Sequence, residues 1–186
     1  MNNFIVGIST GNKDVQMSAG EIECSVLNSE FIKQCNQHNA QVNILPQQNT
    51  TSINLKGLDA LIVTGGGDIN PEMYDQIPDD TIEKVDDLRD STEMNIFIAA
   101  EKMQIRTLAI CRGHQLLNIY KGGTLHQDLN KAGFQKINHQ KPYDDARKHI
   151  HKINIDENTK LKEIIQDEMI LVNSIHHQGL DKLGKD

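Results

Sequence analysis

The sequence contains no tryptophan, and aromatic residues make up only 4% of its 186 positions. Single-stranded nucleic acid is usually held by bases that stack on aromatic side chains, so this composition argues against such a surface. Positive charge is also in short supply: 19 Lys and Arg face 26 Asp and Glu, which gives a formal net charge of −7. A chain with this balance is not expected to bind nucleic acid or an anionic membrane non-specifically.

Long apolar runs are missing as well. No stretch approaches the ~18 apolar residues of a membrane-spanning helix, and no basic segment leads into an apolar one at the N-terminus. The sequence therefore predicts neither a membrane span nor a secretory signal. The three cysteines, Cys24, Cys35 and Cys111, are odd in number and follow no zinc-binding spacing. A reduced, cytoplasmic setting is expected rather than a disulfide framework.

Short apolar runs alternate with stretches of helical periodicity, which is typical of an α/β fold with a mainly parallel sheet. Strands are predicted at 4–9, 41–46, 59–67, 106–110, 151–156 and 168–173. Helices are predicted at 20–39, 83–103, 112–120 and 159–166, and a polar loop at 130–150. No repeat or linker divides the chain, so a single domain over 1–186 is expected, large enough to bury a core.

The segment Ala109-Ile110-Cys111-Arg112-Gly113 joins a predicted strand to a predicted helix, with small residues two positions before and after the cysteine. This layout is typical of a nucleophile elbow, in which a tight turn exposes the reactive atom at the carboxyl end of the sheet. A helix N-terminus favours a thiolate, and the backbone N–H of Arg112 would face a developing oxyanion. A buried structural cysteine is the alternative, but packing alone does not require small residues on both sides.

A second turn, TGGGD at 64–68, also follows a predicted strand. The carboxyl ends of parallel strands meet at one edge of a sheet, so its N–H groups could supply a second oxyanion donor. A phosphate-binding loop is disfavoured, because no Lys-Ser/Thr pair follows and the spacing does not fit the dinucleotide fingerprint. The glycine turn therefore strengthens the case for Cys111 as a nucleophile.

Three segments carry a family resemblance: ICRGHQLLNIYKGGTLHQDL (110–129), VTGGGDINPEMY (63–74) and VNSIHHQGLDKLG (172–184). They resemble the class I glutamine amidotransferase-like superfamily, and within it the γ-glutamyl-γ-aminobutyrate hydrolase branch, which includes relatives of γ-glutamyl hydrolase. The segment DDLRDSTE (86–93) is similar to an acidic-Arg segment of that branch. The resemblance implies a flavodoxin-like three-layer sandwich and a cysteine amidohydrolase that acts on a small γ-glutamyl substrate through a thioester, without metal or cofactor.

The resemblance also implies which residues form the site. They are Cys111 as the nucleophile, Gly65, Gly66 and Arg112 in the oxyanion hole, and Gln115, Ser174, His176 and His177 around the substrate. Ala109 stands where this family usually has a glycine, and alanine is still a small residue.

The base of the triad is the main departure from the family pattern. The His-Pro-Glu run that usually supplies it is absent, and Asp186 falls before the position where it would come. The fold is therefore expected to be shortened at its C-terminus and to lack its usual final elements. Loss of a final strand and helix would expose an apolar face and a sheet edge, so pairing into a homodimer or a rearranged C-terminal part is expected.

Other histidines could take the place of the missing base. His176 or His177, with Asp181 as the orienting acid, is the best local candidate, whereas His114 beside the elbow is expected to pack. The remaining candidates form no zinc-protease motif: His126, His139, His149 and His151. A loose surface metal site made by His149 and His151 stays open.

Three functions are compatible with these features. The first is an enzyme that cleaves a small γ-glutamyl amide. The second is a catalytically impaired relative that keeps the pocket and acts as a binding or scaffold protein, because a thiol without a base lacks a proton donor for the leaving amine. The third is a glutaminase subunit that passes ammonia to a synthetase, which predicts a partner surface near the cysteine.

Overall fold

The computed structural model describes residues 4–137, 139 and 151–185. Its residues form two compact units, the first running to Leu125 and resuming at Leu180, the second spanning His126–Gly179. Of the polar loop predicted at 130–150, residues 138 and 140–150 lie outside the described part. Within the described ranges, no helix is both long enough and apolar enough to cross a membrane.

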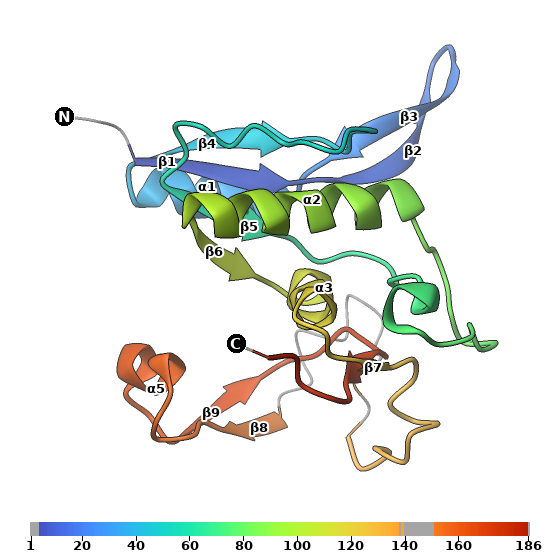
Figure 1. Ribbon diagram of the computed structural model, residues 1–186, viewed down its shortest axis with the longest axis vertical. Helices are drawn as coiled ribbons and strands as arrows, with labels where there is room; N and C mark the ends of the chain where they lie inside the picture. Colours follow the sequence, from blue (N-terminus) through green and yellow to red (C-terminus); the bar gives the residue numbers. More distant parts are fainter. Residues whose placement is uncertain (1–3, 138, 140–150, 186) are drawn as a thin grey trace. The chain divides into compact units, whose positions relative to one another are not determined.

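A four-stranded parallel sheet forms the centre of the first unit (Figure 1). Its strands lie in the order β4 (Ala40–Leu45), β1 (Phe4–Ser9), β5 (Ala60–Val63) and β6 (Arg106–Ala109). In chain order these are the second, first, third and fourth strands of the sheet, which is the flavodoxin-like arrangement. The predicted α/β fold with a mainly parallel sheet is confirmed.

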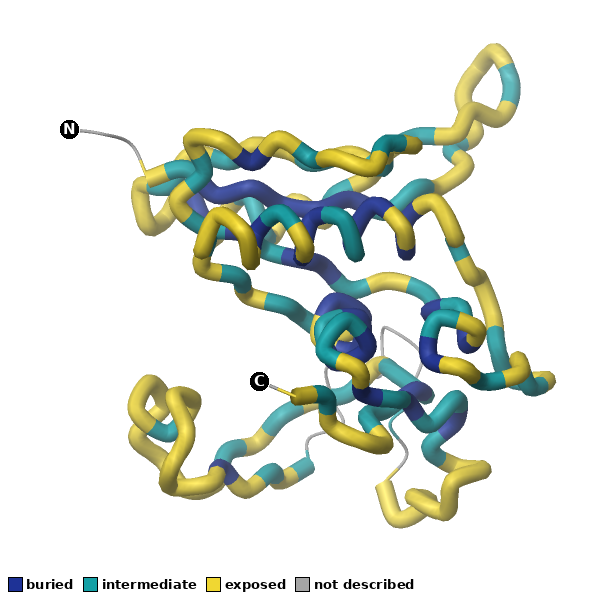
Figure 2. Tube along the Cα trace, viewed as in Figure 1, coloured by how far each residue is buried: buried dark blue, intermediate teal, exposed yellow. Residues whose placement is uncertain are grey.

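Helices cover both faces of this sheet. On one face lies α1 (Ser29–Gln37), and on the other lie α2 (Asp87–Met103) and α3 (Arg112–Tyr120). Alternate side chains of β5 divide between the faces: Ile62 packs in the cluster with α1, and Leu61 packs in the cluster with α2 and α3. Figure 2 shows the resulting buried stretches along the sheet and α3. The predicted three-layer sandwich is therefore present.

The segment before α1 differs from the prediction. The helix predicted over 20–39 is wrong in its first part, because β2 (Gly11–Met17) and β3 (Gly20–Val26) form an antiparallel hairpin and the helix begins only at Ser29. The hairpin turn ends at Gly20, whose φ of +124° glycine adopts without steric cost. The hairpin matters for the site, since its first residues line a cavity beside the glycine turn.

The later elements are short. The first unit also contains the 3-10 helix η1 (Pro71–Tyr74), and the boundary between the units falls in the paired strands β7 (Leu125–His126) and β10 (Gly179–Leu180). The second unit contains β8 (His151–Asn154), α5 (Lys160–Ile165) and β9 (Met169–Val172). The last two predicted strands and the helix between them are thus present, and the two strands pair with each other in antiparallel orientation.

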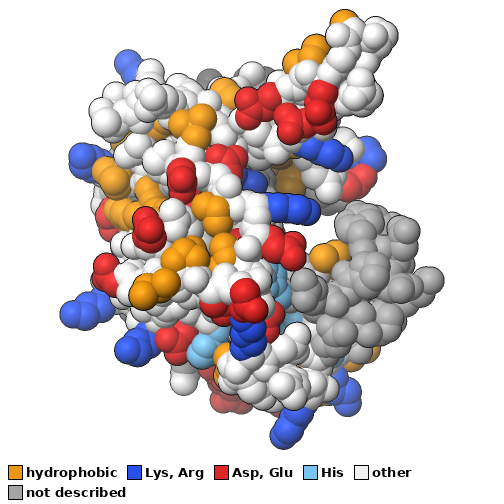
Figure 3. Space-filling model, turned by 90° about the vertical axis from the view of Figure 1, so that its right-hand side faces the viewer, with side chains coloured by type: hydrophobic (Ala, Val, Ile, Leu, Met, Phe, Trp, Pro, Cys, Tyr) orange, Lys and Arg blue, Asp and Glu red, His pale blue; other side chains and the backbone are white. Residues whose placement is uncertain are grey.

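The strand β6 forms one edge of the parallel sheet, and Leu108 on it is 58% exposed. On the face drawn in Figure 3, acidic and basic side chains intermingle with hydrophobic ones. The pairing of two copies across a sheet edge stays a prediction.

Candidate active site

The turn between β6 and α3 holds Cys111 in an unusual backbone conformation. Its φ of 53° and ψ of −112° are rare for a residue with a side chain, and such strain is typical of a nucleophile elbow. The turn is fixed on both sides, since the N–H of Ile110 donates to the carbonyl of Val63 at 2.9 Å and that of Gln115 donates to Cys111 at 3.1 Å. Cys111 is exposed, and its Sγ makes no hydrogen bond to any residue that the structure describes.

Gly113 explains why a small residue follows the cysteine. A β-carbon at this position would lie 2.3 Å from the carbonyl oxygen of Val63, a backbone atom that cannot turn aside as a flexible side chain could. The absence of a side chain lets α3 start directly against β5. The sequence argument from small residues around Cys111 therefore has a steric basis at this position.

The glycine turn lies beside the elbow. A β-carbon on Gly65 would be 3.4 Å from Cβ and 3.8 Å from Sγ of Cys111, so the two predicted turns meet as expected for parallel strands. The turn is held at its far end, where the N–H of Glu83 donates to Oδ2 of Asp68 at 2.7 Å. Gly67 packs against the backbone of Lys84, the residue that follows Glu83. The glycine turn is therefore held in place by contacts with residues 83 and 84.

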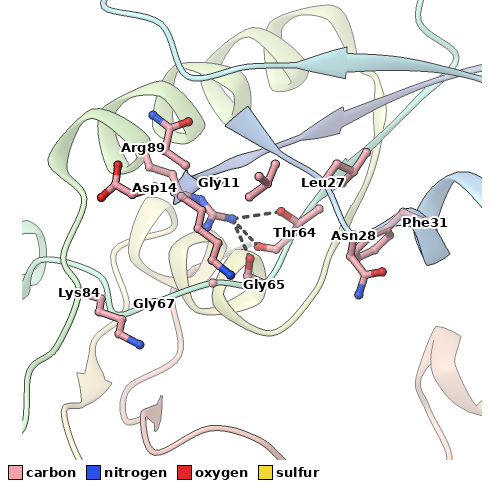
Figure 4. A pocket seen from close by; sticks show the side chains of 14 residues that line it. Gly11, Asp14, Leu27, Asn28, Phe31, Thr64, Gly65, Gly67, Lys84 and Arg89 are labelled. Carbon is pink, nitrogen blue, oxygen red and sulfur yellow. Dashed lines mark hydrogen bonds between the residues drawn. The ribbon is translucent and has the colours of Figure 1, made fainter. Parts of the chain in front are cut away.

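A cavity of about 670 Å³ opens beside this glycine turn (Figure 4). Its walls come from the turn itself, the start of β2, the end of β3 with the start of α1, and the side chains of Lys84 and Arg89. The ammonium groups of Lys13 and Lys84 make no ion pair with the residues that the structure describes, and Asp14 contributes one carboxylate. Lys84 has a φ of 54°, a second strained position next to the loop.

A buried network of charges lies behind both turns. The side chain of Arg112, 1% exposed, donates to Asp90 and Glu93 on α2. Arg89, on the same helix, donates from Nε to Oε1 of Glu93 at 3.1 Å. Burial raises the pKa of Asp90 and lowers the pKa of Arg89, and the opposite charges beside each group act against these shifts. The residue after Cys111 is therefore anchored through its side chain.

Three of the four predicted substrate-side residues, Ser174, His176 and His177, are found in the second unit. Ser174 Oγ lies 2.7 Å from Nε2 of His151, and the N–H of His176 donates to the carbonyl of His139 at 3.0 Å. His177 has its Nδ1 3.4 Å from Oδ2 of Asp128. Gln115 lies in the first unit, in the first turn of α3, and is buried. Their predicted contacts with a substrate stay predictions.

The structure bears on two expectations about the histidines. The carboxylate beside His177 is that of Asp128, whereas Asp181 accepts a hydrogen bond from Oγ1 of Thr124 at 2.8 Å. The prediction that His114 packs is wrong: it is exposed, whereas its neighbours in α3, Gly113 and Gln115, are buried. His149 lies outside the described residues, and no group of three or more metal-binding side chains is found among the others.

Sequence reasoning missed Arg89, Lys84 and Lys13 as parts of the site. A signal existed for the first, since Arg89 and Glu93 lie four residues apart on a helix, and opposite charges at this spacing pair with each other. Lys13 belongs to the segment that was not recognised as a hairpin, so nothing placed it near the glycine turn.

Comparisons with known proteins agree on the family. The profile of the peptidase C26 family matches residues 4–186. A Schizosaccharomyces pombe protein named as a glutamine amidotransferase, PB2B2.05, is 40% identical over 128 residues, which are 68% of this chain and 49% of that protein. The γ-glutamyl-γ-aminobutyrate hydrolase PuuD of Escherichia coli is 29% identical over 131 residues, 67% of this chain and 50% of PuuD. The chain thus spans about half the length of these curated relatives.

A solved structure shows the same fold. A glutamine amidotransferase from Thermotoga maritima superposes with a TM-score of 0.59 at 13% sequence identity, over 98% of this chain and 64% of that one.

Proposed function

The chain belongs to the peptidase C26 family of class I glutamine amidotransferase-like proteins, and we propose that it attacks γ-glutamyl amide bonds with Cys111. The observation that carries the proposal is the elbow, which presents an exposed thiol in a strained turn directly beside Gly65. A structural cysteine would need neither the strain nor the exposure.

The proposed reaction has two steps. The sulfur of Cys111 adds to the γ-carbonyl carbon, and the N–H groups of Arg112 and of the glycine turn stabilise the oxyanion. The intermediate collapses to a thioester as the C–N bond breaks, and the leaving amine takes up, through solvent, the proton that the thiol lost on attack. Water then cleaves the thioester, which releases glutamate and restores the thiol.

The cavity beside the glycine turn supports a substrate that carries carboxylates. Its lining includes two lysines, Lys13 and Lys84, and one acidic residue, Asp14. In γ-glutamyl-γ-aminobutyrate both halves carry a carboxylate, whereas the ammonia lost from glutamine has none. The cavity therefore favours a γ-glutamyl amide with an acidic amine half over glutamine as the substrate.

A comparison of two substrates tests this function. The protein is incubated with γ-glutamyl-γ-aminobutyrate or with glutamine, free glutamate is measured, and acid-quenched samples are examined by intact-protein mass spectrometry for a glutamyl adduct. Release of glutamate that depends on Cys111 supports a hydrolase, and preference for glutamine would instead favour a glutaminase. An adduct without release would favour an impaired relative that binds its ligand.

The control is Cys111→Ala, which removes the nucleophile and leaves a side chain of similar size. Loss of such a residue lowers turnover on the order of 10⁴-fold or more, so the variant is expected to give only background glutamate. Equal background from both proteins, with no adduct on the wild type, would refute the proposal.

A further inference from the structure

Arg89 makes several contacts with the glycine turn although it lies on a different element. It sits in the first turn of α2 and is 6% exposed. Its Nη2 donates to the carbonyl of Gly65 at 2.8 Å and to Oγ1 of Thr64 at 3.1 Å (Figure 4). A buried guanidinium is thus hydrogen-bonded to the backbone of the loop that would supply an oxyanion donor.

The same guanidinium lies close against the loop. A β-carbon on Gly66 would lie 2.1 Å from Nη1 of Arg89, and one on Gly11 would lie 2.8 Å from the same atom. These two glycines therefore leave room for the arginine, and a larger residue at position 66 would clash with it. The contact leaves Arg89 little freedom to swing away from the loop.

The carbonyl that Arg89 holds determines where the next N–H points. In a trans peptide, the C=O of Gly65 and the N–H of Gly66 point in opposite directions, so fixing one fixes the other. The hydrogen bond from a cation also polarises the peptide group and makes the N–H a stronger donor. The N–H of Gly66 is thereby directed away from the guanidinium.

Arg89 is linked to the second donor through Glu93. Oε1 of Glu93 accepts from Nε of Arg89, and Oε2 accepts from Arg112, the residue whose own N–H follows the cysteine. One carboxylate on α2 thus braces both turns of the site. Ser9 also donates to Oε1 of Glu93, at 2.8 Å, and completes its shell.

We propose that Arg89 is a positioning residue that sets the orientation of the Gly65–Gly66 peptide, so that the Gly66 N–H serves as the oxyanion donor. This role rests on the proposed γ-glutamyl chemistry at Cys111. It differs from a role in substrate binding, although Arg89 also lines the cavity. A binding role would act on KM, whereas a positioning role acts on the rate of acylation.

The variant Arg89→Lys tests the proposal, because lysine keeps the charge beside Glu93 but cannot bond both Glu93 and Gly65 as the guanidinium does. Arg106→Lys makes the same change at an exposed arginine on β6 and is the matched control. Since one oxyanion donor is worth about 10²–10³-fold, partial misplacement should slow acylation of Cys111 by about 10–100-fold. KM and the rate of alkylation by iodoacetamide should stay within a few-fold of the wild type.

A second measurement does not depend on activity. The amide resonance of Gly66 in a ¹⁵N–¹H spectrum should shift or split in Arg89→Lys and remain unchanged in Arg106→Lys. An unchanged Gly66 resonance, or acylation at the wild-type rate, would overturn the proposal, as would a change confined to KM. If the wild type forms no adduct and releases no glutamate above the Cys111→Ala background, the proposed function fails, and the Gly66 resonance alone decides whether Arg89 orients the peptide.

Discussion

The substitution Glu93→Gln is expected to destabilise the protein strongly. Glu93 is 1% exposed and accepts hydrogen bonds from both Arg89 and Arg112, so a neutral amide leaves two buried guanidinium groups with one carboxylate, that of Asp90. Breaking a buried ion pair by removing one partner costs about 3–5 kcal/mol. In a chain of this size ~1 kcal/mol corresponds to about 2–4 °C, so the melting temperature should fall by about 6–20 °C.

Thermal and urea unfolding followed by circular dichroism measure this loss. Glu101→Gln is the matched control, since Glu101 lies on the same helix and pairs with Lys121 at 2.7 Å in an exposed position. Exposed pairs contribute little, and this variant should unfold like the wild type. The reasoning is refuted if Glu93→Gln is no less stable than Glu101→Gln, because the buried network would then carry no net stabilisation.

Three further outcomes are expected. Gly113→Ala should lower the free energy of unfolding by about 1–3 kcal/mol or more in urea melts, because its methyl group meets the backbone of β5. Gly65→Ala should leave the free energy of unfolding unchanged but slow alkylation of Cys111. Equal stability of the two variants would contradict this reasoning. Lys84→Gln should raise KM for γ-glutamyl-γ-aminobutyrate a few-fold and leave KM for glutamine unchanged; equal effects on both substrates would argue against the ammonium group. Burial and two neighbouring histidines lower the pKa of His139, so the unfolded state takes up its proton first and stability should fall as the pH drops below about 6.5 towards the lower folded-state pKa. His139→Gln should flatten that slope in unfolding measured across the pH range, and an unaltered slope would rule out this histidine as its source.

The parallel sheet could be predicted because its strands are short apolar runs, and the two central ones, β1 and β5, are largely buried. The hairpin before α1 could not be separated from a helix by the same reasoning. Ile22 and Val26 are four residues apart, as on a helix face, but Ile22, Cys24 and Val26 also alternate as on a strand. Gly20, which begins β3 directly after the turn and has a positive φ, is the signal that favours the strand.

The meeting of the two site turns was predictable from the rule that the carboxyl ends of parallel strands share one edge. The side chain of Arg112 was not, because nothing in its local pattern indicates whether an arginine after an elbow faces solvent or the core. Its partners, Asp90 and Glu93, lie about twenty residues earlier on another helix. Such pairing is a property of tertiary packing, which periodicity along a single element does not contain.

The buried network also bears on how the strained cysteine is maintained. A residue in a sparsely populated backbone region costs about 1–3 kcal/mol, so neighbouring contacts must hold Cys111 at its φ of 53°. Those contacts lie on both sides of Cys111. The N–H of Ile110 is hydrogen-bonded to the backbone of β5, the side chain of Arg112 pairs with two carboxylates, and Gly113 packs directly against the backbone of Val63. The chain cannot relax at Cys111 without breaking one of them. A variant that loosens Arg112 should therefore lower stability and change the reactivity of the thiol together, because the same contacts support both.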